Sequence, residues 1–173
     1  MLTRVTAVAI ALALAARSSP PPAAPAAADT LPYQVDVVRV GQFEVLGDPE
    51  ISAAPDTAAG KVSAHSSVQL ISESTTLKAE RGATFGFTYV IKGVPDGEFP
   101  GFEMQALHPP MTGPSGKATT ESRVETQVFG EQGVAVNDII YVLAEPFEVL
   151  PGNWTLQLLY KGKVVVSRQF VLQ

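Results

Sequence analysis

The residues best suited to chemistry lie in and just before the stretch ALHPPMTGPSGKATTE, residues 106–121. This stretch contains His108, one of two histidines in the chain, and Met111, while Met104 comes two residues before it. An imidazole together with two thioethers forms a soft ligand set that suits Cu(I). The sequence therefore offers a candidate copper site with Met104, His108 and Met111 as its ligands.

The same residues also fit a purely structural role. Met104 lies in an apolar, strand-like segment, where methionine commonly fills gaps in a core. His108 precedes Pro109 and can hydrogen-bond across a loop. Pro109 and Pro110 stiffen the backbone, and the glycines of residues 113–116 turn it. We favour a rigid loop between two strands, with no cofactor, and keep copper binding as the alternative.

Nucleotide binding and serine catalysis both fail on spacing. A phosphate loop needs glycine five places before its Gly-Lys pair and a hydroxyl residue after the lysine, but Met111 and Ala118 occupy those positions. Ser115 lacks the Gly-x-Ser-x-Gly arrangement of a nucleophile elbow. A hydrolase that uses Ser115 or Glu148 is therefore only a second alternative.

Paired carboxylates give a similarly weak signal for glycoside hydrolysis. Glu145 and Glu148 are three residues apart, and Glu121 and Glu125 are expected on one face of a strand. Glycosidases need two such groups at a set separation within a cleft. Because the chain has 17 acidic residues, pairs of this kind are expected by coincidence.

Alternating apolar and polar residues predict the strands that must position these groups. The clearest case is ATFGFTYVIKG, in which Phe85, Phe87, Tyr89 and Ile91 share one face. Other strands are expected at residues 33–46 with an interruption at Gly41, and at residues 67–72, 102–108, 119–130, 138–145, 153–160 and 163–173. Residues 47–61 are expected to be loop. The nearly all-apolar segment 138–145 is expected to be buried on both sides or central in its sheet.

Turns separate these segments at short intervals. A tight turn at Lys161–Gly162 joins the last two strands into a hairpin that carries Trp154. The pattern predicts an all-β fold, an antiparallel immunoglobulin-like β-sandwich of about eight strands spanning residues 29–173. A small closed barrel is the alternative architecture.

The first residues indicate export. Arg4 precedes a twelve-residue apolar run, residues 5–16, which is too short to span a bilayer and typical of a secretory signal. A Pro/Ala tract follows, and cleavage after Ala16 or after Ala28 fits the pattern. We assign residues 1–28 to the signal peptide and this tract, and expect a periplasmic or secreted protein without a transmembrane segment in the mature chain.

Composition excludes several kinds of site and argues against one class of partner. The chain has no cysteine, so disulfides, thiol catalysis and cysteine metal sites are excluded. Its formal net charge is −5, and its basic residues do not cluster, which argues against nucleic acid as a partner.

Several segments resemble one family of exported bacterial domains that is classed only as a domain of unknown function. The most specific are the Thr-Phe-Gly-Phe segment at residues 84–87, His108-Pro109, and Glu148 leading into Pro-Gly-Asn-Trp at residues 151–154. The resemblance implies a small all-β extracytoplasmic domain and brings no catalytic residue with it. We therefore expect a non-catalytic binding or structural domain of the bacterial envelope whose partner is another envelope protein or an extracytoplasmic ligand.

Overall fold

Strands form almost all the regular structure of the residues described by this computed structural model, 31–65 and 67–173. The elements are β1 (Gln34–Leu46), β2 (Glu50–Ala53), β3 (Lys61–Ala64), β4 (Ser67–Ser72), β5 (Thr76–Leu77), β6 (Thr84–Lys92), β7 (Gly101–Thr112), β8 (Ala118–Gln127), β9 (Val134–Val142), the 3₁₀ helix η1 (Pro146–Glu148), β10 (Gly152–Tyr160) and β11 (Lys163–Leu172). The predicted signal peptide and Pro/Ala tract, residues 1–28, lie outside the described residues. Within the described part of the chain, no helix has the length and apolar character needed to cross a membrane.

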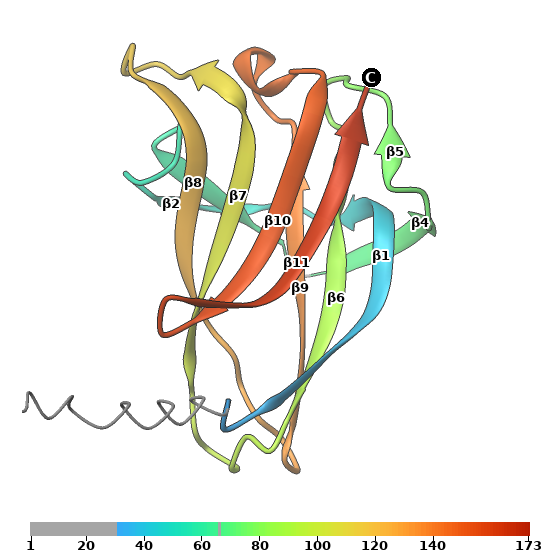
Figure 1. Ribbon diagram of the computed structural model, residues 1–173, viewed down its shortest axis with the longest axis vertical. Coiled ribbons are helices and arrows are strands. Elements are labelled where there is room, and N and C mark those ends of the chain that lie inside the picture. The colour runs from blue at the N-terminus through green and yellow to red at the C-terminus, as the bar shows by residue number, and fades with distance from the viewer. Residues whose placement is uncertain (1–30, 66) are drawn as a thin grey trace, which may run out of the picture. The chain divides into compact units, whose positions relative to one another are not determined.

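Two sheets form the layers of the fold. One has the strand order β4-β1-β6-β9 and the other β5-β11-β10-β7-β8, while β2 and β3 pair with each other as a separate hairpin. In Figure 1, β7, β10 and β11 lie in front of β6 and β9. All neighbouring strands are antiparallel except β5 and β11, which are parallel. The two sheets remain separate, so the fold is the predicted sandwich and not a closed barrel.

The core lies between β6 and β10. The alternation in β6 places Phe85, Phe87, Tyr89 and Ile91 inward, as the sequence predicted, and each is at most 1% exposed. Trp154, Leu156 and Leu158 face them from β10 and are fully buried. The ring centroids of Phe85 and Trp154 are 5.7 Å apart in an edge-to-face arrangement. Aromatic packing at the centre therefore holds the two sheets together.

The last two strands form the predicted hairpin, with a register shift between Leu158 and Leu159. Trp154 pairs with Phe170, and Tyr160 pairs with Lys163 beside the two-residue turn. Lys161 and Gly162 both have positive φ angles, 51° and 73°, as a tight hairpin turn requires.

The loop predicted around His108 is shorter than expected. β7 continues through His108, Pro109, Pro110 and Met111, so only residues 113–117 form the connection to β8. The pairing between β7 and β8 shifts register between Leu107 and Met111. Because proline has no N–H for the ladder, the two prolines fit where that ladder is interrupted. The prediction of a stiff loop over the whole stretch was wrong.

Two further predictions about elements were also wrong. Residues 47–61 were expected to be loop, but they contain β2 and the first residue of β3. The apolar strand expected at the centre of a sheet is β9, which lies at the edge of its sheet. Alternate residues of β9 pack into the core, whereas Val136, on its other face, is 63% exposed.

Candidate ligand-binding site

A cavity of about 210 Å³ lies where the inner face of β7 and β8 passes the edge strand β9. We call it the lateral cavity. Its walls come from both sheets, from η1 and the residues before it, and from the chain between β1 and β4: Met104, Ala106, Ser122, Val124, Ile140, Tyr141, Val142, Ala144, Glu145, Glu148, Pro49, Thr57, Ala58, Ala59, Lys61, Val62, Ser63 and His65. None of the side chains that β7 and β8 contribute carries a ring, and two of them, Ala106 and Ser122, are small, so they leave space that the rings of the central core fill.

The β2–β3 hairpin forms one wall of the lateral cavity. Its tip is internally bonded, with the Thr57 hydroxyl donating to the carbonyl of Ala54 at 2.8 Å. The backbone N–H of Arg123 in β8 donates to the carbonyl of Asp56 at 3.2 Å, which fixes the tip against the sheet edge. Ala58 is buried against Gly113, where an added Cβ atom would lie 1.9 Å from the Ala58 carbonyl oxygen. Glycine at 113 therefore permits the hairpin to dock.

An ion pair borders the cavity on its exposed side. The Lys61 ammonium lies 2.8 Å from a carboxylate oxygen of Glu145, with the two side chains 44% and 31% exposed. The hydrogen bond from Lys61 lowers the pKa of Glu145. Solvent screens exposed pairs of this kind, so they contribute little to stability. The Lys61–Glu145 ion pair connects the β2–β3 hairpin to the segment before η1, but it adds little to the stability of that contact.

Glu148 is a buried carboxylate in the cavity wall. One of its oxygens accepts hydrogen bonds from the backbone N–H groups of Ala144 and Glu145, at 2.9 and 2.8 Å, and the other accepts one from the Tyr141 hydroxyl at 3.2 Å. Burial raises the pKa of Tyr141, and the charge of Glu148 raises it further. The predicted pair of Glu145 and Glu148 is thus brought to one cavity, but each carboxylate is already engaged by a different partner.

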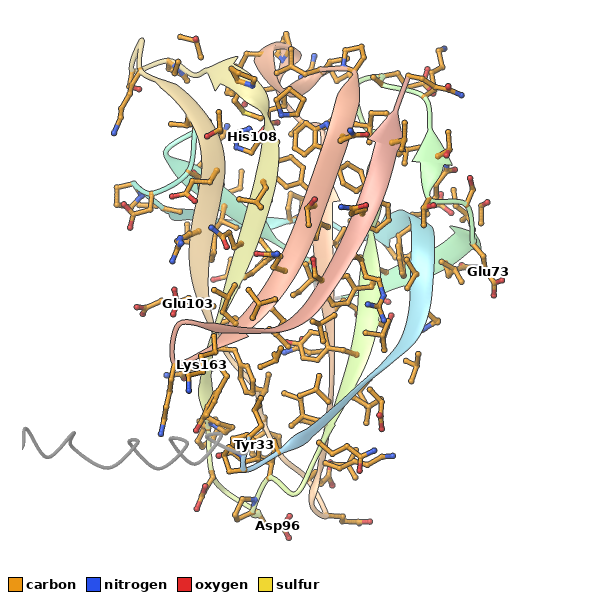
Figure 2. The ribbon with its side chains drawn as sticks, viewed as in Figure 1. Tyr33, Glu73, Asp96, Glu103, His108 and Lys163 are labelled. Atoms are coloured by element: carbon orange, nitrogen blue, oxygen red, sulfur yellow. The ribbon has the colours of Figure 1, made fainter. Side chains whose placement is uncertain are left out.

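His108 is held in the upper half of β7 in Figure 2, at the opposite end of the sandwich from Tyr33 and Asp96. Its Nδ1 lies 2.9 Å from the carbonyl oxygen of Pro109, and its Nε2 lies 3.3 Å from the Ser122 hydroxyl. A carbonyl oxygen only accepts, so the contact with Pro109 is a hydrogen bond in the tautomer that carries its proton on Nδ1, and in that tautomer Nε2 accepts from Ser122. Burial lowers the pKa of His108, although the carbonyl of Pro109 and nearby carboxylates oppose the shift.

The three candidate copper ligands all lie on β7. Met104 lines the lateral cavity, Met111 is 2% exposed in the core, and the ring of His108 packs on Trp154 with centroids 5.3 Å apart. At a rise of about 3.3 Å per strand residue, the Cα atoms of Met104 and His108 are roughly 13 Å apart. Copper binding there would replace a hydrogen bond that His108 makes now, and it stays a prediction. Among the described residues, no group of three or more His, Asp or Glu side chains is placed to hold a metal ion.

The other sequence candidates do not converge on a site. Ser115 is exposed in the turn between β7 and β8, where its hydroxyl accepts from the backbone N–H of Lys117. Glu121 and Glu125 are exposed on the outer face of β8, and Glu121 lies 3.9 Å from Arg123. These groups are solvated surface residues.

Sequence reasoning missed two polar groups of the lateral cavity. His65 lies just after β3, and Ser122 lies on the inward face of β8; both line the cavity. A hint for Ser122 was present, since it is a small polar residue on the apolar face of an alternating strand. His65 gave no signal, because the hairpin before it was taken for loop.

A comparison with known protein families identifies the domain. Residues 46–172 match a family described as a domain of unknown function (DUF3859). The chain belongs to this family. The resemblance seen in the sequence is therefore confirmed. Every residue that lines the lateral cavity lies within the matched range of this DUF3859 domain.

A solved structure supports the fold assignment of the DUF3859 domain. It is an immunoglobulin-like protein from Pseudomonas aeruginosa, 20% identical in sequence, with a TM-score of 0.58, and the match covers 81% of this chain and 97% of that one. At this identity the likeness concerns the fold alone, and it confirms the predicted immunoglobulin-like β-sandwich. No curated protein matches the chain.

Proposed function

We propose that this protein is an exported, non-catalytic domain of the bacterial envelope, periplasmic or secreted, that binds a small extracytoplasmic ligand in the lateral cavity. Export rests on the short apolar run behind Arg4 and the Pro/Ala tract that follows it. A binding role accords with an immunoglobulin-like fold, although such folds serve many functions.

The lateral cavity is the observation that carries the binding proposal. Ligand sites are concave and mostly apolar, with a few polar groups that fix the orientation of the ligand. Met104, Val124 and Ile140 give this cavity an apolar wall, and His65, Ser122 and Glu148 give it polar groups at separate points. Ser122 and Glu148 already bond within the protein, so His65 is the polar group of the wall that remains open to a ligand.

Native mass spectrometry of the protein, purified gently from its own envelope, tests this proposal. We expect the wild-type protein to carry an added small-molecule mass. Val124→Phe should lose that mass, because the larger ring fills the cavity, while the matched variant Val136→Phe should keep it, because Val136 is exposed on β9. Equal occupancy in both variants would rule out the cavity as the site, and a bare wild-type protein would count against the proposal. An added mass of one copper would support the site at Met104, His108 and Met111 instead.

The contact between the Ser122 hydroxyl and the His108 ring allows a separate test of the proposal that the domain is not an enzyme. A hydroxyl next to an imidazole is the geometry of an activated serine, and the Pro109 carbonyl orients the ring. Burial lowers the basicity of this histidine, so we expect no reaction of Ser122 with a fluorophosphonate probe. Covalent labelling that His108→Gln abolishes would show instead that the domain is a hydrolase.

A further inference from the structure

His65 is the polar group of the lateral cavity that lacks a protein partner. The residue is half-buried, but both its ring nitrogens are buried, and neither has a hydrogen-bond partner among the described residues. Burial lowers the pKa of His65, so the ring is neutral at pH 7. A neutral imidazole presents one N–H donor and one acceptor. Because buried polar atoms are nearly always paired, the ring suits an occupant that can both donate and accept.

The charges around the cavity disfavour an anionic occupant. Its wall contains the carboxylates of Glu145 and Glu148, while its one lysine, Lys61, is already paired with Glu145. Glu148 already accepts three hydrogen bonds, so it has little need of a further donor. A neutral ligand therefore fits these surroundings better than a carboxylate or a phosphate.

The volume of the cavity limits the size of the occupant. An apolar cavity of about 150 Å³ is known to hold benzene. The 210 Å³ available here therefore accommodates a six-membered ring with one or two small substituents. Met104, Val124, Ile140 and Val142 supply the apolar contacts that such a ring requires.

We propose that the lateral cavity binds a small neutral ring compound with one hydroxyl group, and that His65 recognises that hydroxyl. This inference rests on the proposed function, since it names the chemistry of the ligand for the same cavity. The two nitrogens of an imidazole ring point away from each other, so one hydroxyl group pairs with one of them, by donating to the unprotonated nitrogen or by accepting from the N–H. An apolar ring of the same size would leave both nitrogens unpaired, and a site built for a hydroxyl rejects such an analogue.

The two methionines of β7 provide a test within one spectrum. The full chain, exported and labelled with ¹³C in the methionine methyl groups, is titrated with 4-methylphenol and separately with 1,4-dimethylbenzene, which replaces the hydroxyl by a methyl group of similar size. Met104 lines the cavity, whereas Met111 is buried and is not among the lining residues, so it serves as the control. We expect 4-methylphenol to shift the Met104 signal in a saturable way, to leave Met111 unchanged, and to bind at least about tenfold more tightly than 1,4-dimethylbenzene.

The variant His65→Phe separates hydroxyl recognition from simple binding in the cavity. It keeps a ring at position 65 but removes both nitrogens, so the two compounds should then bind equally. The ¹⁵N signals of the His65 ring in the wild-type protein give a second reading, and these should move with 4-methylphenol only. Equal binding of both compounds to the wild-type protein would overturn the role of His65 and leave cavity binding intact. If neither compound moves the Met104 signal, both the inference and the binding site that underlies it are wrong.

Discussion

The centre of the sandwich and its lateral cavity are built from the same two sheets but differ in what fills them. At the centre, β6 and β10 bring Phe85, Phe87 and Trp154 together with no exposed surface. At the lateral cavity, β7 and β8 offer Ala106 and Ser122, and a hairpin from elsewhere in the chain forms the outer wall. Large rings fill the space between facing strands, whereas small and polar side chains leave it open. The difference separates the residues that hold the fold from those available for binding.

The largest expected effect tests the centre. Trp154→Ala removes a fully buried indole that packs on Phe85 and donates from Nε1 to the carbonyl of Leu150 at 3.1 Å. We expect the free energy of unfolding to fall by about 3–5 kcal/mol. Urea denaturation followed by circular dichroism measures this, because the variant lacks the only tryptophan.

The exposed residue Val136 provides the control for that measurement. Val136→Ala should change the free energy of unfolding by less than about 0.5 kcal/mol. If Trp154→Ala and Val136→Ala lost similar free energies of unfolding, the aromatic centre would not be the main source of stability.

A smaller effect is expected in the wall of the lateral cavity. Glu148→Ala leaves two backbone N–H groups and the Tyr141 hydroxyl without their acceptor. We expect a loss of about 1–3 kcal/mol in the free energy of unfolding, measured in the same way. Glu148→Gln should lose less, since its amide oxygen can still accept from the two N–H groups. A loss in Glu148→Ala as large as that of Trp154→Ala would make this wall part of the core.

The smallest expected effect concerns pH. Burial lowers the pKa of His108 in the folded protein, so the unfolded chain binds a proton more readily as the pH falls through its ordinary pKa of about 6.5. Stability is then fully present above about pH 7.5 and decreases toward pH 5.5, by at most about 1.4 kcal/mol from this histidine. Nearby Glu121 and Glu148 favour the protonated ring and reduce the loss.

Denaturation curves at pH 7.5 and 5.5 measure this dependence. His108→Gln cannot titrate and should show a smaller difference between the two pH values than the wild-type protein. An unchanged difference would assign the pH dependence to His65, whose pKa burial also lowers, and would move the sensitive group to the hairpin wall of the cavity.

The sequence predicted the centre of the molecule well and the cavity poorly, for a physical reason. Alternation over β6 and β10 reflects a strand with one face in the core, so Phe85, Tyr89 and Trp154 were placed correctly from local pattern alone. The lateral cavity depends on which strands become edges and on where a distant hairpin docks. Neither is encoded by the period of a single strand.

Particular residues illustrate this limit. The apolar run in β9 reads as a central strand, but Ile140 and Val142 are apolar because they line the cavity beside an edge. The prolines after His108 read as the start of a loop, but they occupy a register shift within β7. Local sequence described the backbone preferences correctly in both cases, and long-range pairing decided the outcome.

The position of β11 has a consequence for the order in which the molecule can fold. This strand, residues 163–172, lies between β10 and the much earlier β5, and it is the strand through which β5 joins its sheet. Contacts between such distant segments form late and slow folding. The sheet that contains β5 can therefore be completed only once residues 163–172 are available, so loss of these last residues would leave β5 without its partner strand and expose the edge of β10.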